Sequence, residues 1–180
     1  MSTTVLSRSR MSFGRTVAAS FAIGAVITLA LIGSRLDHFS AVAVLARPPH
    51  WPDLHLFFSQ SPAMQAHVLA ALGAVGLGAV LMLRRKGKTF HRIGGWVWSA
   101  LLTTVALSSL FIFDLTGAWS YLHLFSGWVM VFLPLAILFA RRRQVTRHRT
   151  MMMVLFYGSL LISGVLAFLP GRLMWQLLFG

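Results

Sequence analysis

Four of the seven histidines occupy a repeated pattern along the chain. His67 and His123 lie just inside the starts of two long apolar runs, and His91 and His148 each open the apolar run that follows. The spacing is 24 residues from His67 to His91 and 25 residues from His123 to His148. Each spacing is one membrane crossing plus a short basic loop. Ionisable side chains are costly in hydrocarbon and usually face a site or a partner, and neutral imidazole is a good metal ligand. The pattern predicts cofactor sites inside a membrane.

The depths of these histidines pair them across helices. His67 and His123, the outer pair, each lie five residues into a run that enters from the external side, about 7 Å deep at roughly 1.5 Å per residue. His91 and His148, the inner pair, meet near the cytoplasmic side. The two levels differ by about 16 residues of helix, on the order of 24 Å, which is too far for one shared metal. Each pair is therefore predicted to supply two axial ligands to one of two stacked haems.

The chain has no cysteine, which excludes disulfides, iron–sulfur clusters and covalently attached c-type haem. The predicted cofactor is therefore haem b, two per chain, held without a covalent link. Matched depth favours haem over a metal or proton pathway, in which polar groups would form a ladder through the midplane.

Glycines follow two of the histidines at helical spacing. Gly94 and Gly95 come three and four residues after His91, and Gly127 comes four residues after His123, so each lies on the ligand's own helix face. A missing side chain there would let a macrocycle lie close to the backbone. The alternative is that these glycines permit close packing of helices.

Two arginines directly follow the inner pair, and two of the three histidines outside the pattern are candidate ligands. Arg92 and Arg149 are candidate charge-assisted partners of haem propionates, although their place in basic loops already accounts for them. His50 and His55 lie in an external stretch and could bind an external metal or substrate, but solvated loop residues are the more usual case. Met151 to Met153 are expected to be apolar filler.

The composition is that of an integral membrane protein. Hydrophobic residues make up 57% of the chain and charged residues 11%, with a mean hydropathy of +0.78, which is too apolar for a soluble domain. A helix needs about 20 apolar residues to cross the hydrocarbon layer, and helices satisfy their own backbone there. We therefore expect an all-α bundle forming one membrane domain over residues 1–180. Its five transmembrane helices are expected at 16–34, 62–83, 93–113, 118–140 and 151–170.

The last four predicted helices form two copies of one hairpin. Residues 62–113 and 118–170 each read as early His, apolar helix, basic triplet, His-Arg and apolar helix. Because both begin on the same side, they would be parallel repeats around an axis along the membrane normal. The helix at 16–34 lies outside this four-helix core, and 35–61 is expected to be an external loop because its prolines forbid a continuous helix.

The basic residues indicate the topology. The net charge is +13, and thirteen of the sixteen Lys and Arg residues fall at the N-terminus or in the loops 84–92 and 141–149. Short loops rich in Lys and Arg stay in the cytoplasm, so the N-terminus is expected inside and the C-terminus outside, in a bacterial cytoplasmic membrane. Since topology explains the charge, nucleic acid is not an expected partner.

The His-Arg-Ile-Gly-Gly-Trp element at 91–96, the outer pair, and His148-Arg149 followed by a Met resemble a family of small bacterial membrane proteins labelled domain of unknown function 2306. The likeness covers both hairpins. The layout of four helices with two histidine pairs is also similar to the di-haem ascorbate-dependent cytochromes b. That likeness implies electron transfer across the membrane, with the outer pair as external haem ligands and the inner pair as internal ones.

Two functions from different classes follow. The first is a transmembrane b-type di-haem cytochrome that accepts electrons from quinol, an ascorbate-like reductant or a partner redox subunit. The second is a cofactor-free accessory subunit of a larger membrane complex, in which the histidines hydrogen-bond between helices and the basic loops hold anionic lipid. The chain has no glutamate and only three aspartates, so membrane oxidoreduction is the one enzymatic activity that the sequence suggests.

Overall fold

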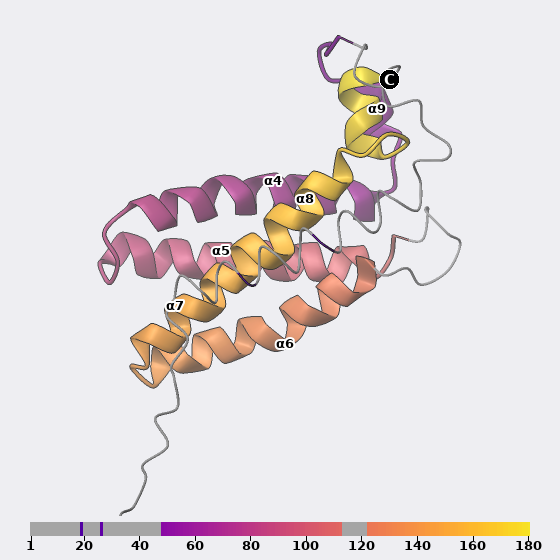
Figure 1. Cartoon of the computed structure of the whole chain (residues 1–180). Helices are drawn as coiled ribbons and strands as arrows, with labels where there is room; N and C mark the ends of the chain where they lie inside the picture. The colour runs from indigo at the N-terminus through magenta and orange to yellow at the C-terminus, as the bar shows by residue number, and fades with distance from the viewer. Residues whose placement is uncertain (1–18, 20–25, 27–47, 113–121) are drawn as a thin grey trace, which may run out of the picture.

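The computed structural model describes residues 19, 26, 48–112 and 122–180, in which every regular element is a helix (Figure 1). These elements are α3 (Leu54–Phe58), α4 (Pro62–Leu83), α5 (Thr89–Ser109), α6 (Leu122–Arg141), α7 (Val145–Met153), the π-helix η2 (Val154–Leu161), α8 (Ile162–Ala167) and α9 (Leu173–Phe179). The described part of the chain is therefore all-helical. The predicted helix at 16–34 lies outside the described residues, apart from two single positions.

α4 and α5 form the first hairpin. Ser61 caps α4 by accepting a hydrogen bond from the backbone N–H of Met64, and Pro62 occupies the first turn, where its missing N–H costs nothing. α4 has the bounds expected from the sequence. α5 begins at Thr89 and ends at Ser109, four residues earlier at both ends than the predicted 93–113. Gly87, with φ of +83°, makes the turn between the two helices.

α6 and the continuous run of α7, η2 and α8 form the second hairpin. α6 begins at Leu122, and positions 118–121 of the predicted helix lie outside the described residues. The run that follows begins at Val145 and ends at Ala167, whereas the sequence predicted 151–170. The prediction began too late because the first turns, Val145–Thr150, are polar. An apolar run locates the hydrocarbon stretch and not the start of the helix.

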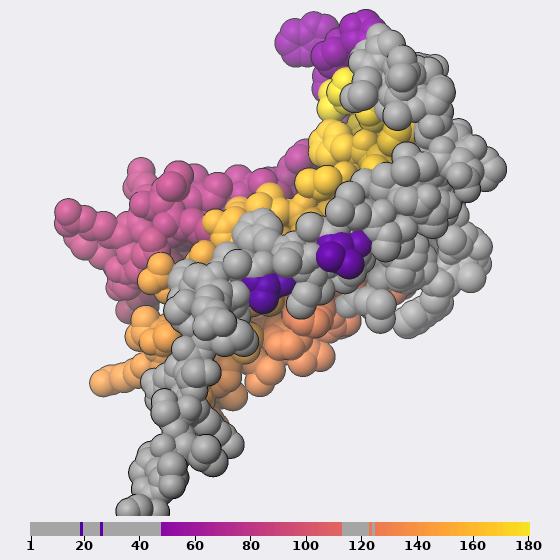
Figure 2. Space-filling model, in the orientation of Figure 1, coloured from indigo at the N-terminus to yellow at the C-terminus, as the bar shows by residue number. Residues whose placement is uncertain are grey.

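Two short helices at one end of the molecule were not predicted. The expected loop 35–61 contains α3 where it is described, and Asp53 caps that helix by accepting the N–H of Leu56. The backbone N–H groups of His50 and Asp53 donate to carbonyls of α9, at 2.8 and 3.1 Å. The segments before and after the four long helices thus meet, as the purple and yellow surfaces at the top of Figure 2 show.

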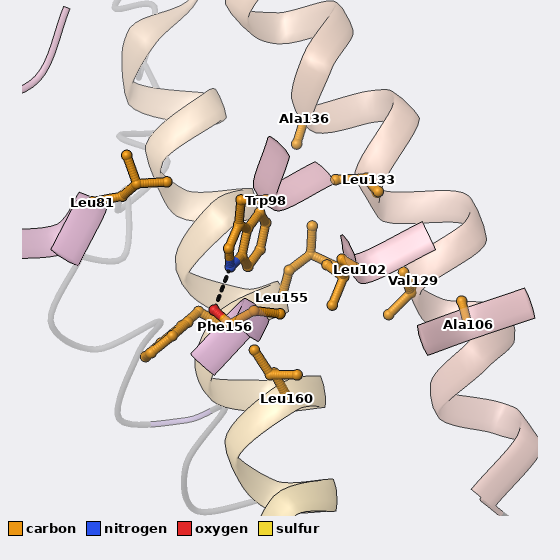
Figure 3. Packing of buried hydrophobic residues seen from close by; sticks show 11 residues of the cluster. Leu81, Trp98, Leu102, Ala106, Val129, Leu133, Ala136, Leu155, Phe156 and Leu160 are labelled. Carbon is orange, nitrogen blue, oxygen red and sulfur yellow. Dashed lines mark hydrogen bonds between the residues drawn. The ribbon is translucent and has the colours of Figure 1, made fainter. Parts of the chain in front are cut away.

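Trp98 of α5 lies at the centre of the hydrophobic core (Figure 3). Its side chain is 3% exposed, and its indole N–H donates to the carbonyl of Ala74 on α4 at 2.9 Å. A Cβ added at Gly78 would lie 2.6 Å from Phe156 and 2.7 Å from the Trp98 indole nitrogen. Because only a glycine leaves room there, α4 can approach both α5 and η2 at this point.

Two of the described helices are long and apolar enough to cross a membrane. They are Pro62–Leu83, with 22 residues and a mean hydropathy of 2.1, and Val145–Ala167, with 23 residues and 1.9. Only 22% and 28% of their apolar windows are buried inside the protein. The core helix of a soluble protein would be mostly buried, so the outward-facing apolar surface supports a membrane location. α6 contains a shorter apolar stretch, Phe125–Arg141, and the five-helix arrangement stays a prediction.

Reporter fusions test the predicted topology. Four consecutive crossings after Ser61 would place the turn at Gly87 in the cytoplasm and Gly180 outside. We therefore expect alkaline phosphatase fused at Gly180 to be active and the same reporter fused at Gly87 to be inactive. A cytoplasm-active reporter at the same two positions should give the reverse. Equal signals at both positions would contradict the crossing map and the assignment of histidines to two levels.

Candidate functional site

The outer pair lines a single cavity of about 580 Å³, which we call the outer cavity. Its walls come from α4, α5, α6 and the run of η2 and α8, and its remaining side comes from α9. His67 reaches it from the second turn of α4, and His123 from the first turn of α6. Small-molecule and cofactor sites are usually mostly apolar cavities of roughly 300–1,000 Å³ with a few polar groups, which is the character of this one.

One hydrogen bond orients the ring of His67. Its Nδ1 lies 3.0 Å from the carbonyl oxygen of Val105 and 3.1 Å from the hydroxyl of Ser108, both on α5. A carbonyl only accepts, so Nδ1 carries the proton and donates it. The proton-free nitrogen is then Nε2, the atom that can ligate a metal. Ligating histidines are commonly held in this way by a bond from the other ring nitrogen.

His123 faces the same cavity from α6 and is 9% exposed. Its Nε2 is buried and makes no hydrogen bond within the described part of the chain. The residue as a whole does have an interaction partner. Two residues further on, Phe125 also lines the cavity, and the hydroxyl of Ser126 contacts that of Ser109 on α5. Phe125 therefore faces the cavity, and Ser126 lies at the contact between α6 and α5.

One wall of the cavity includes part of a π-helix. Ser159 of η2 and Ser163 of α8 line the cavity, and their hydroxyls donate to the carbonyls of Leu155 and Ser159 in their own helix. π-helical turns are rare and frequently occur at functional sites, because the wider turn shifts the side chains that follow it. No pattern of single residues in the sequence predicts such a turn.

α9 brings Arg172 and Gln176 to the cavity, and the sequence did not single out either residue. Arg172 precedes the first residue of α9, and Gln60, from the turn before α4, joins them. Gly171, with φ of +83°, makes the turn that leads into α9. Gln60, Arg172 and Gln176 thus add polar groups to the mostly apolar lining of the cavity that His67 and His123 share.

The inner pair is also brought together. His148 Nδ1 donates to the carbonyl of Ala136 on α6 at 2.9 Å, the same type of bond that orients His67. His91 Nδ1 is buried and makes no hydrogen bond in the described part of the chain. The rings of His91 and His148 are near enough to interact electrostatically. Neither residue lines the outer cavity.

The hydrogen bonds place the two pairs in separate layers. His148 is bonded to Ala136, which is thirteen residues beyond His123 on α6. His67 is bonded to Val105, which is fourteen residues beyond His91 on α5. Both separations are about 20 Å at roughly 1.5 Å per residue, close to the spacing expected from the sequence.

The predicted glycines differ in their surroundings. A Cβ at Gly94 would meet the side chain of Leu81 at 2.9 Å, so this glycine serves the packing of α4 against α5. Gly95 and Gly127 have nothing within 4 Å of an added Cβ, but neither is among the residues that line the outer cavity. For Gly94, helix packing is therefore the alternative that the structure supports.

The predicted charged and external residues lie on the surface. Arg92 and Arg149 are exposed and do not line the outer cavity. They are also absent from the lining of a second hollow, a groove between α5 and α6. His50 and His55 are also exposed, and His50 Nδ1 contacts the carbonyl of Trp51 at 2.7 Å. Over the described residues, no group of three or more His, Cys, Asp or Glu side chains is placed to hold a metal ion. Two-ligand haem sites do not need such a group.

Comparison with known proteins adds no relative to this description. No family model matches the chain, and no curated protein or solved structure is significantly similar to it.

Proposed function

We propose that this protein is a b-type di-haem cytochrome that transfers electrons across a membrane. The observation that supports this most is the outer cavity: two histidines from different helices line it, and the ring of His67 is oriented with Nε2 available. Haem supplies reversible one-electron chemistry when bound. The chain would supply imidazole ligands, a mostly apolar cavity and a few polar groups in its lining.

The role of each residue follows from its position. The carbonyl of Val105 holds the proton of His67 on Nδ1, which fixes the tautomer and raises the basicity of Nε2. Arg172 also lines the cavity and adds a guanidinium to its lining. The inner pair, about 20 Å away along α5 and α6, would hold the second haem. Two layers at this spacing would carry an electron from an external donor towards the cytoplasm.

A redox spectrum tests the proposal. Protein purified from cells supplied with haem precursor should show haem b bands in a dithionite-reduced minus oxidised spectrum. Extraction into pyridine should give about two haems per chain, since each needs two axial ligands. A preparation that is folded by circular dichroism but has no such absorption, even after addition of hemin, would rule out the cytochrome.

The second candidate function is a cofactor-free subunit of a larger membrane complex. The bonds of His67 to α5 and of His148 to α6 favour it, because each joins neighbouring helices without any cofactor. The same spectrum distinguishes the two functions. A haem-free protein that co-purifies with other membrane subunits in fixed stoichiometry would support this candidate.

A further inference from the structure

A groove of about 510 Å³ lies between α5 and α6, away from the residues of the outer cavity. It extends from Thr103 to Trp96 on α5 and from Leu133 to Arg141 on α6. Because the two helices are antiparallel, the Trp96 end of the groove on α5 meets the Arg141 end on α6. Trp96 and Arg141 therefore lie together beside the basic loops. We propose that this groove binds one anionic phospholipid, with the phosphate at Arg141 and an acyl chain along the groove.

The walls suit an acyl chain. Most of the lining is apolar, and its two hydroxyls are already used within α5: Ser99 donates to the carbonyl of Gly95 at 2.8 Å and Thr103 to that of Ser99 at 2.8 Å. Their protons are therefore not available for the carbonyl oxygens of a quinone. On α6, Arg141 lies eight residues beyond Leu133, a distance of about 12 Å along the helix. That length fits within one leaflet of a hydrocarbon layer roughly 30 Å thick.

Pro134 lies inside α6, at the end of the groove away from Arg141. Proline in a helix interior has no N–H to donate, and its ring crowds the preceding turn. The carbonyl four residues earlier, that of Met130, then lacks its usual N–H partner in the helix.

The charge at the end of the groove calls for an anion. The guanidinium carbon of Arg141 lies 5.9 Å from the centroid of the Trp96 ring, a cation–π contact that brings the charged group to the end of the groove. In the described part of the chain the one acidic residue is Asp53, at the opposite end of the molecule, where it caps α3. No described carboxylate can therefore pair with Arg141. A guanidinium binds phosphate through two parallel hydrogen bonds, and the cytoplasmic leaflet is rich in anionic lipid.

Native mass spectrometry of the detergent-purified full chain tests the site. We expect one phosphatidylglycerol to remain bound at concentrations at which phosphatidylcholine with the same acyl chains does not. Arg141→Gln should weaken phosphatidylglycerol binding about tenfold, because it removes a charge-assisted bidentate contact. Arg142→Gln is the matched control: it removes the same charge from the adjacent, exposed position outside the groove and should change binding less than twofold.

A second variant tests the groove itself and keeps every charge. Ala100→Trp places a bulky side chain in the groove and should lower phosphatidylglycerol binding by a similar factor. Equal losses in Arg141→Gln and Arg142→Gln would show a diffuse attraction to the basic surface and overturn the proposal. So would displacement of the lipid by one equivalent of a short-chain quinone. Lipid binding is measured independently of the haem content of the sample. The lipid site and the cytochrome are therefore tested by separate experiments.

Discussion

Purified His67→Ala and His123→Ala proteins should each lose the same one of two haem b components, and the haem content should fall from about two to about one per chain. Both side chains line the outer cavity, and a six-coordinate haem held between them needs both. The double variant should lose little more than either single one, because residues that act as one unit are not additive. Difference spectra and pyridine extraction measure both quantities.

His55→Ala is the matched control, since it removes an exposed histidine at the same end of the molecule. It should retain both components. His91→Ala and His148→Ala should remove the other component, the one nearer the basic loops. If His67→Ala and His91→Ala removed the same component, the two-layer arrangement would be wrong, since these residues belong to levels about 20 Å apart.

Gly78→Leu should lower the midpoint of thermal unfolding in detergent by several degrees or prevent folding. The new side chain would collide with the ring of Phe156 and with the Trp98 indole, which donates to Ala74. Overpacking a core typically costs about 1–3 kcal/mol, and these two rings have little space in which to move. Loss of the Trp98 bond would add to the cost.

Gly76→Leu is the control for this prediction. Gly76 lies on the same helix, is exposed, and has nothing within 4 Å of an added Cβ. Both variants gain the same helix propensity, so the difference between their midpoints measures the collision at position 78. Equal midpoints would show that α4 does not approach η2 and α5 as closely as described.

The sequence by itself determined the all-helical class, the bounds of α4 and the placement of histidines near helix ends. These properties depend on local rules. Apolar runs of about 20 residues form helices in hydrocarbon, and a helix rise of roughly 1.5 Å per residue converts spacing into depth. The levels expected from counting residues agree with those that the bonds of His67 and His148 show. The ends of α5 and α7 were less predictable, because polar first turns continue a helix beyond its apolar run.

Only the tertiary structure decided which atoms share a site. The hydrogen bond from His67 Nδ1 to the carbonyl of Val105 joins residues 38 positions apart, and Arg172 and Gln176 reach the cavity because α9 packs beside it. The sequence alone did not distinguish Gly78 from the other glycines of α4. In the structure, α5 and η2 both pack closely against it. Each of these facts depends on how helices pack, and packing is set by shape complementarity between distant segments rather than by any periodicity within one of them.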